Sequence, residues 1–121
     1  MERLSGGRLV AQTLKRQGVE QIFTLSGGHI MDIYYGCREV GIEIIHMRSE
    51  PSAGYAAAAY AGITGQPGVM VTTAGPGVTN ATTAMVEAGC AGVPLIHIGG
   101  AADTSRLDSG DDQDTNTLEI M

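Results

Sequence analysis

Two residues capable of acid–base chemistry lie where the sequence changes from an apolar run to a helical one. Glu50 follows the run IEIIHM and precedes Pro51, a residue type favoured at the first position of a helix. His29 follows Gly27 and Gly28, just after the run VEQIFTL. A carboxylate or an imidazole held against a ligand can transfer protons near neutral pH. An acidic residue also complements a helix N-terminus, and a histidine can simply face solvent, so spacing alone leaves both interpretations open.

The pattern that positions these residues alternates apolar runs with helical segments. We expect helices at residues 5–17, 30–40, 51–63 and 79–89, and strands at 19–25, 42–47, 69–74 and 94–100. Strands separated by helices of this length predict βαβ units, and their continuous apolar character predicts helices on both faces. The expected fold class is therefore α/β, a parallel sheet flanked by helices. His46 and His97 fall inside strands, so we expect them to be buried, hydrogen-bonded core histidines.

The carboxyl ends of the four expected strands define one edge of the sheet, where ligands of open parallel α/β folds bind. The segments at this edge are 26–29, 48–50, 74–77 and 99–101. The run GPGVTN, which starts at Gly75, could form a backbone cradle for a phosphate or a heteroaromatic ring. It lacks the lysine of GxxxxGK[ST], and it is not a GxGxxG motif in the first strand-to-helix turn. Both differences disfavour a generic nucleotide-binding α/β domain.

Composition excludes several other classes of protein. The 121 residues are enough for one domain, and 43% hydrophobic with 17% charged residues is typical of a globular chain. A formal charge of -6 and no basic patch argue against nucleic acid or an anionic membrane as partner. We find no apolar stretch of ~18 residues and no secretory signal. Two cysteines suggest neither a disulfide scaffold nor a zinc cluster, so we expect no metal ligands and a reducing, cytoplasmic setting.

The stretch after Ala102 differs from the rest of the chain. It holds six acidic residues and one basic residue, which is five of the six net negative charges. The acidic loop 108–114 could suggest a cation site, but without EF-hand spacing a solvated loop is favoured. The last residues, TLEIM, are typical of the start of a helix, and a four-stranded parallel sheet would leave an apolar edge exposed. We therefore expect residues 1–121 to be one domain truncated at its C-terminal end.

Four stretches match a known family in order and spacing: GVEQIFTLSGGHIMDIY, the RSE before a helix, GYAAAAYAGITGQPGVMVTTAGPGVTNA and VPLIHIGG. With these stretches, which cover essentially the whole chain, the sequence resembles the N-terminal, pyrimidine-binding domain of thiamine-diphosphate-dependent enzymes. The branch it resembles contains acetolactate synthase, 2-hydroxyacyl-CoA lyase and benzaldehyde lyase. The resemblance implies a carbon–carbon lyase or carboligase acting on 2-hydroxyketones, 2-hydroxyacyl thioesters or 2-keto acids.

The resemblance also implies residue roles. Glu50 stands where the family keeps the glutamate that hydrogen-bonds a ring nitrogen of the aminopyrimidine, so that the cofactor becomes an electron sink. His29 resembles the histidine of benzaldehyde lyase that handles the substrate hydroxyl together with a glutamine, which aligns with Gln113. Acetolactate synthases usually have a small residue at the position of His29, and Ser26 stands here before the glycine pair that binds the cofactor. The implied cofactor contacts, besides Glu50, are Gly27, Gly28, Thr73, Gly75 and Asn80.

The family's GDG…N motif, which holds Mg²⁺ and the diphosphate, does not occur in this sequence. The resemblance therefore implies that the Mg²⁺ ligands lie outside this chain, on a second subunit or domain that carries the pyrophosphate-binding half. It implies a small carbonyl substrate, a homodimer or homotetramer of the full-length protein, and an isolated chain that is inactive. Two alternatives stay open: a large subunit of the acetolactate synthase type, and a non-catalytic truncated paralogue that docks on a full-length enzyme.

Overall fold

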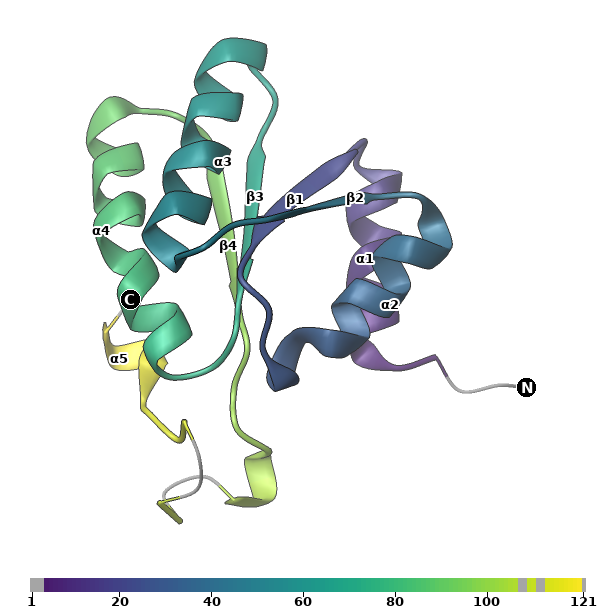
Figure 1. Ribbon diagram of the computed structural model, residues 1–121, viewed down its shortest axis with the longest axis vertical. Coiled ribbons are helices and arrows are strands. Elements are labelled where there is room, and N and C mark those ends of the chain that lie inside the picture. The colour runs from purple at the N-terminus through teal and green to yellow at the C-terminus, as the bar shows by residue number, and fades with distance from the viewer. Residues whose placement is uncertain (1–3, 107–108, 111–112, 121) are drawn as a thin grey trace.

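The fold is built around a parallel sheet, seen in the computed structural model, which describes residues 4–106, 109–110 and 113–120 (Figure 1). The strands are β1 (Gln21–Thr24), β2 (Glu43–His46), β3 (Gly68–Thr72) and β4 (Leu95–Gly99). Their order across the sheet is β2-β1-β3-β4, and every neighbouring pair is parallel. The helices are α1 (Gly6–Arg16), α2 (Met31–Val40), α3 (Glu50–Thr64), α4 (Pro76–Ala91) and α5 (Thr117–Ile120), with 3-10 turns at Gly28–Ile30 and Thr104–Arg106. The expected parallel α/β fold is confirmed.

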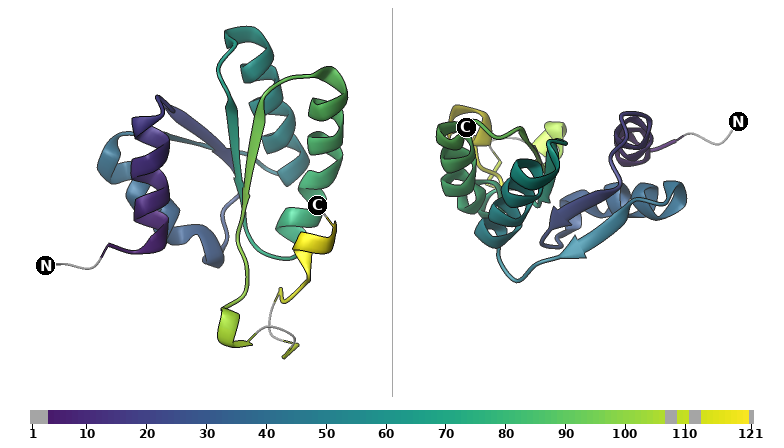
Figure 2. Two further views of the ribbon diagram at one scale, coloured as in Figure 1. Left: turned by 180° about the vertical axis from the view of Figure 1, so that it is seen from behind. Right: turned by 90° about the horizontal axis from the view of Figure 1, so that it is seen from above.

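The helices form two layers, one on each side of the sheet (Figure 2). Ile22 of β1 and Val69 of β3 pack with α1 and α2, whereas the next residues along, Phe23 and Met70, pack with α3 and α4. This alternation follows from the two-residue period of a strand. The predicted continuous apolar runs are therefore needed, because both faces of the central strands β1 and β3 are buried.

Helix ends at the carboxyl edge of the sheet are set by local chemistry. The Ser49 hydroxyl accepts a hydrogen bond from the Ser52 backbone N–H at 3.4 Å, which caps α3 and makes Glu50 its first residue. Helix α4 begins at Pro76, three positions before the predicted start, because proline is well suited to the first turn. Glu50 and the glycine-rich segment that starts at Gly75 therefore each lie at a helix N-terminus.

A buried hydroxyl pair fixes β1 to its neighbours just before the loop that carries His29. The Thr24 hydroxyl lies 2.6 Å from the Val71 carbonyl oxygen and donates to it. The Tyr34 hydroxyl, also 2.6 Å away, must then donate to Thr24, since a threonine hydroxyl has one proton to give. Burial raises the pKa of Tyr34, so the phenol keeps its proton and the link between β1, β3 and α2 persists.

The prediction that His46 is a buried core histidine is wrong. His46 is the last residue of β2, an edge strand, and its side chain is exposed. Its Nε2 accepts the Ser26 backbone N–H at 3.3 Å and lies 3.1 Å from the Ser26 hydroxyl. His97, on the other edge strand, is half-buried rather than buried, and it forms the predicted hydrogen bond, to the Thr72 hydroxyl at 2.8 Å. Apolar surface does remain at that edge, where Ile96 of β4 is 44% exposed.

Candidate functional site

The loops after the four strands meet at one edge of the sheet. His29 follows β1, Glu50 follows β2, Thr73 follows β3 and Gly100 follows β4. Hydrogen bonds join these loops into two sets, one around Glu50 and one around Thr73. The prediction that the loops after the four strands lie at one edge of the sheet is thus confirmed.

Glu50 and Asn80 form the first set. Glu50 is half-buried at the start of α3, and the Asn80 side-chain Nδ2, from the second turn of α4, donates to its Oε2 at 3.3 Å. Among the residues that the structure describes, no hydrogen bond to the other carboxyl oxygen, Oε1, is formed. The carboxylate also lies in the first turn of α3, where the helix dipole favours negative charge. The helix N-terminus interpretation of Glu50 is therefore satisfied, and its interaction with a ligand stays a prediction.

His29, Thr73 and Gln113 form the second set. The His29 Nδ1 lies 3.3 Å from the Thr73 hydroxyl oxygen, and that hydroxyl donates to the Gln113 Oε1 at 3.2 Å. Thr73 is buried, whereas the His29 side chain is exposed and Gln113 is half-buried. The structure thus brings together the imidazole and the amide that the sequence places 84 positions apart (113 − 29). No hydrogen bond between described residues joins this set to Glu50.

Two of the predicted cofactor glycines make room for the second set. A Cβ on Gly27 would collide with the side chain of Thr73, including its hydroxyl oxygen. Gly75 has φ 56° and ψ -115°, a backbone conformation that disfavours any side chain, and a Cβ there would lie 2.9 Å from the Gln113 carbonyl oxygen. Gly28, by contrast, has open space where a Cβ would be. Close packing therefore explains Gly27 and Gly75 without a ligand, and Gly28 faces outward.

Two side-chain hydrogen bonds at or near this edge were not predicted from the sequence. The Thr72–His97 and Ser26–His46 hydrogen bonds depend on which strands are neighbours, and no spacing along the sequence carries that information. Burial lowers the pKa of His97, which favours its neutral form.

Other potentially reactive groups offer no competing site. Burial raises the pKa of the Cys37 thiol to about 11, so it stays protonated and is a poor nucleophile. In the described part of the chain, no cluster of three or more His, Cys, Asp or Glu could hold a metal ion. Asp108, Asp111 and Asp112 of the acidic loop lie outside the described residues. Over the same described ranges, none of the helices has the length and apolar character needed to span a bilayer.

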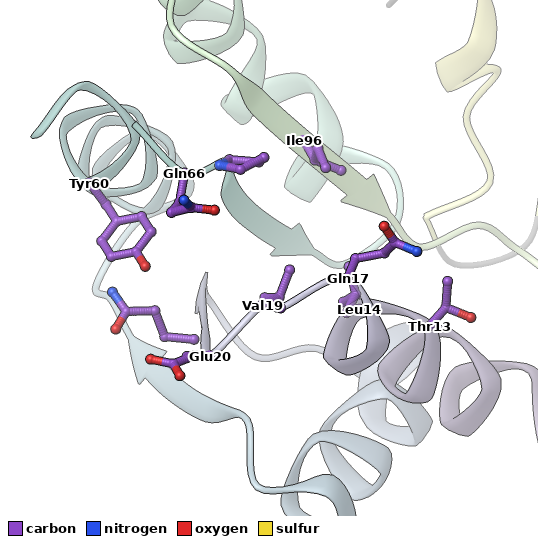
Figure 3. Close-up of a pocket in the computed structure, with 11 residues that line it drawn as sticks. Thr13, Leu14, Gln17, Val19, Glu20, Tyr60, Gln66 and Ile96 are labelled. Carbon is purple, nitrogen blue, oxygen red and sulfur yellow. The ribbon is translucent and has the colours of Figure 1, made fainter. Parts of the chain in front are cut away.

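A pocket of ≈ 360 Å³ lies at the opposite edge of the sheet (Figure 3). Its lining includes Val19 and Glu20, which precede β1, and Gln66, which precedes β3. Tyr60 and Ile96 close its sides. Because ligands of parallel sheets bind beyond the carboxyl ends, this pocket at the amino ends is not the candidate site.

Comparison with known proteins agrees with this geometry. The family described as thiamine pyrophosphate enzyme, N-terminal TPP binding domain, matches residues 4–120. A probable acetolactate synthase of Mycobacterium bovis is 44% identical over 99% of this chain and 22% of its own length. The 2-hydroxyacyl-CoA lyase 2 of Danio rerio is 44% identical over 96% of this chain and 19% of its own, and the Homo sapiens protein of that name is 42% identical over 96% and 18%.

The chain thus spans about a fifth of the length of the curated relatives it matches. The family match covers all of the described residues, and it includes all four strands and the loops that follow them. The two named activities among these relatives, acetolactate synthase and 2-hydroxyacyl-CoA lyase, are the branches that the sequence resembles. The chain belongs to the thiamine pyrophosphate enzyme family, as a member of its N-terminal TPP binding domain.

Proposed function

We propose that this chain supplies the pyrimidine-binding half of a thiamine-diphosphate-dependent carbon–carbon lyase or carboligase. Its substrates would be 2-hydroxyketones, 2-hydroxyacyl thioesters or 2-keto acids. The observation that carries the proposal is the Glu50 carboxyl group, in which Oε2 accepts a hydrogen bond from Asn80 and Oε1 has no hydrogen bond to a described residue. A carboxyl group fixed in this way can hold a proton between Oε1 and a nitrogen of an aminopyrimidine ring.

The residues around Glu50 fit such a ring. Asn80 orients the carboxyl group, and Gly28, which has open space where a Cβ would be, leaves room at the same edge of the sheet. When bound, thiamine diphosphate supplies an electron sink for the carbon–carbon bond that is broken or formed. We place the ligands of its diphosphate and Mg²⁺ on a second subunit or domain, because the relatives are about five times as long as the matched region.

The second set of residues suits the substrate. A hydroxyl group bound next to the cofactor could give its proton to the His29 imidazole, with Gln113 as a second hydrogen-bonding group. A 2-hydroxyacyl thioester or 2-hydroxyketone has such a hydroxyl. A second candidate function is that of an acetolactate synthase large subunit, which the 44% identity to the Mycobacterium bovis relative favours equally.

The test uses two chimeras. Residues 4–120 replace the aligned N-terminal stretch of the Mycobacterium tuberculosis acetolactate synthase large subunit in one and of the Danio rerio 2-hydroxyacyl-CoA lyase 2 in the other. We expect Glu50→Gln to lower kcat about 100-fold or more in both, the usual contribution of a general acid–base group.

The matched control is Glu43→Gln, the same change at the exposed first residue of β2, far along the strand from the site. It should leave kcat within about twofold, as is usual for surface substitutions. If Glu50→Gln had no more effect than Glu43→Gln while the parent chimeras were active, the proposal would be wrong.

A further inference from the structure

The Thr73 hydroxyl is the junction of the second set of residues. It donates its proton to the Gln113 Oε1 at 3.2 Å, and the same oxygen lies 3.3 Å from the His29 Nδ1. A threonine hydroxyl has one proton and two acceptor lone pairs. Since the single proton is committed to Gln113, a hydrogen bond between His29 and Thr73 requires that the imidazole be the donor.

We propose that Thr73 sets the tautomer of His29, so that Nδ1 carries the proton and Nε2 presents a lone pair to the ligand. In a neutral imidazole one nitrogen is a donor and the other an acceptor, and the bond made by one decides the state of the other. Thr73 is in this sense a positioning residue. The inference rests on the proposed function, in which the exposed edge of the imidazole meets a substrate hydroxyl.

The surroundings of Thr73 hold its hydroxyl in this position. The residue is only 8% exposed. A Cβ on Gly77 would lie 2.7 Å from the Thr73 Cγ2, and one on Gly27 would collide with its hydroxyl oxygen, so backbone packs closely against two sides of the side chain. A Cβ on Gly100 would lie 2.7 Å from the His29 Cβ, so the histidine is also seated against backbone. Tight packing leaves few other rotamers for the Thr73 side chain.

The tautomer matters for chemistry. With Nδ1 protonated, the neutral ring can accept a proton only at Nε2, the nitrogen that has no hydrogen bond to a described residue. The opposite tautomer would offer Nε2–H as a donor and could not remove a proton from a substrate hydroxyl there. Thr73 therefore determines whether the His29 Nε2 acts as a base or as a hydrogen-bond donor.

The test reads the tautomer directly. The chain has three histidines, so two-dimensional ¹H–¹⁵N spectra of the uniformly ¹⁵N-labelled 121-residue chain contain three imidazoles, assigned with His46→Gln and His97→Gln. At about pH 8.5 an ordinary histidine is neutral, and the ring ¹⁵N shifts show which nitrogen is protonated. We expect His29 in the Nδ1–H form in the unaltered chain.

Thr73→Val keeps the shape and removes the acceptor, and we expect the ratio of the two tautomers to move about fivefold to tenfold toward Nε2–H, the effect of losing one ordinary hydrogen bond. Thr73→Ser should restore the original ratio. Thr72→Val is the matched control, because the adjacent threonine binds His97 and should change only the His97 signals. Gln113→Glu keeps an acceptor for the Thr73 proton and should preserve the Nδ1–H form, whereas Gln113→Leu should weaken it.

A His29 that is Nε2–H in the unaltered chain, or Nδ1–H to the same extent in Thr73→Val, would overturn the inference. Should Thr73→Val not fold, the Gln113→Glu and Gln113→Leu pair decides, and equal tautomer ratios in these two variants would also overturn it. None of these readings depends on turnover. A tautomer that follows Thr73 in a chain whose chimeras are indifferent to Glu50 would refute the proposed function and leave the inference standing.

Discussion

Individual residues at the carboxyl edge form two hydrogen-bonded sets, one that we propose for the cofactor and one that we propose for the substrate. Glu50 is tied to α4 through Asn80, while His29 is tied to β3 through Thr73. Because no hydrogen bond among described residues connects the two sets, each should be separable by substitution. The reaction that each set serves can then be tested on its own.

His29→Ala should distinguish the two candidate reactions. We expect cleavage in the lyase chimera to fall about 100-fold or more, since the substrate hydroxyl loses its base. Acetolactate formation in the synthase chimera should change little, because a 2-keto acid brings no hydroxyl to deprotonate. His46→Ala, an exposed histidine bound to Ser26 at the same edge, is the control. An equal fall in both chimeras would mean that His29 has a structural or general cofactor role.

His97 makes stability depend on pH. Burial lowers the pKa of His97 in the folded chain, so between that value and the ordinary histidine value of about 6.5 the unfolded chain binds more protons. The stabilisation is therefore fully present above about pH 6.5 and is lost as the pH falls below it. Urea unfolding at a series of pH values from about 8 to 5 measures this loss, and His97→Gln should reduce the slope. Identical slopes in the unaltered chain and in His97→Gln would contradict the prediction.

Helix α3 offers a matched pair of glycines at the scale of secondary structure. A Cβ on Gly54 would collide with the Ala84 Cβ of α4, whereas the nearest atom to a Cβ on Gly62 is the Val93 Cγ1 at an ordinary 3.6 Å. We expect Gly62→Ala to raise the free energy of unfolding by roughly 0.5–1 kcal/mol, because alanine loses less backbone entropy in a helix. Gly54→Ala should lower it by about 1–3 kcal/mol through overpacking. Urea unfolding of each variant measures these changes in the free energy of unfolding. Changes of the same sign in the two variants would show that α3 and α4 do not pack as described.

Element types were predictable from the sequence because their signals are local. Helical spacing, Pro51 at a helix start and the apolar runs predicted every strand and the four long helices. The lateral order of the strands was not predictable, because parallel strands can be neighbours in several orders with the same connections. The prediction of a buried His46 is wrong for this reason. The run IEIIHM is apolar, yet it forms an edge strand whose last side chain is exposed.

The site was predictable only as a set of loops at one edge. Residue types and the family resemblance identified His29, Glu50 and Gln113, and the structure places His29 and Gln113 on one hydroxyl. The resemblance implied Thr73 as a cofactor contact, whereas its hydrogen bonds to His29 and Gln113 depend on how the loops pack. Gly27 and Gly75 were expected to approach a cofactor, yet they leave room for Thr73 and Gln113, a relation between loops that no linear motif encodes.

At the scale of the whole molecule, the candidate site is an open edge. Glu50 is half-buried and His29 is exposed. Enclosed sites bury most of a small ligand, and an open edge that contacts one side of it cannot. The carboxyl group and glycine-rich loops would thus contribute only part of the binding free energy of a cofactor with a diphosphate at its other end.

The isolated 121-residue chain should accordingly bind thiamine diphosphate weakly. By isothermal titration with Mg²⁺ present we expect a Kd weaker than about 100 μM, because the diphosphate and metal contacts that we place on the other half are missing. The two chimeras, which regain that half, should bind in the micromolar range, and Glu50→Gln should weaken their binding while Glu43→Gln does not. Micromolar binding to the isolated chain that is lost in Glu50→Gln would mean that this domain carries a complete cofactor site. Weak binding that persists in the chimeras would instead mean that the carboxyl edge is not the pyrimidine site, since restoring the other half should complete it.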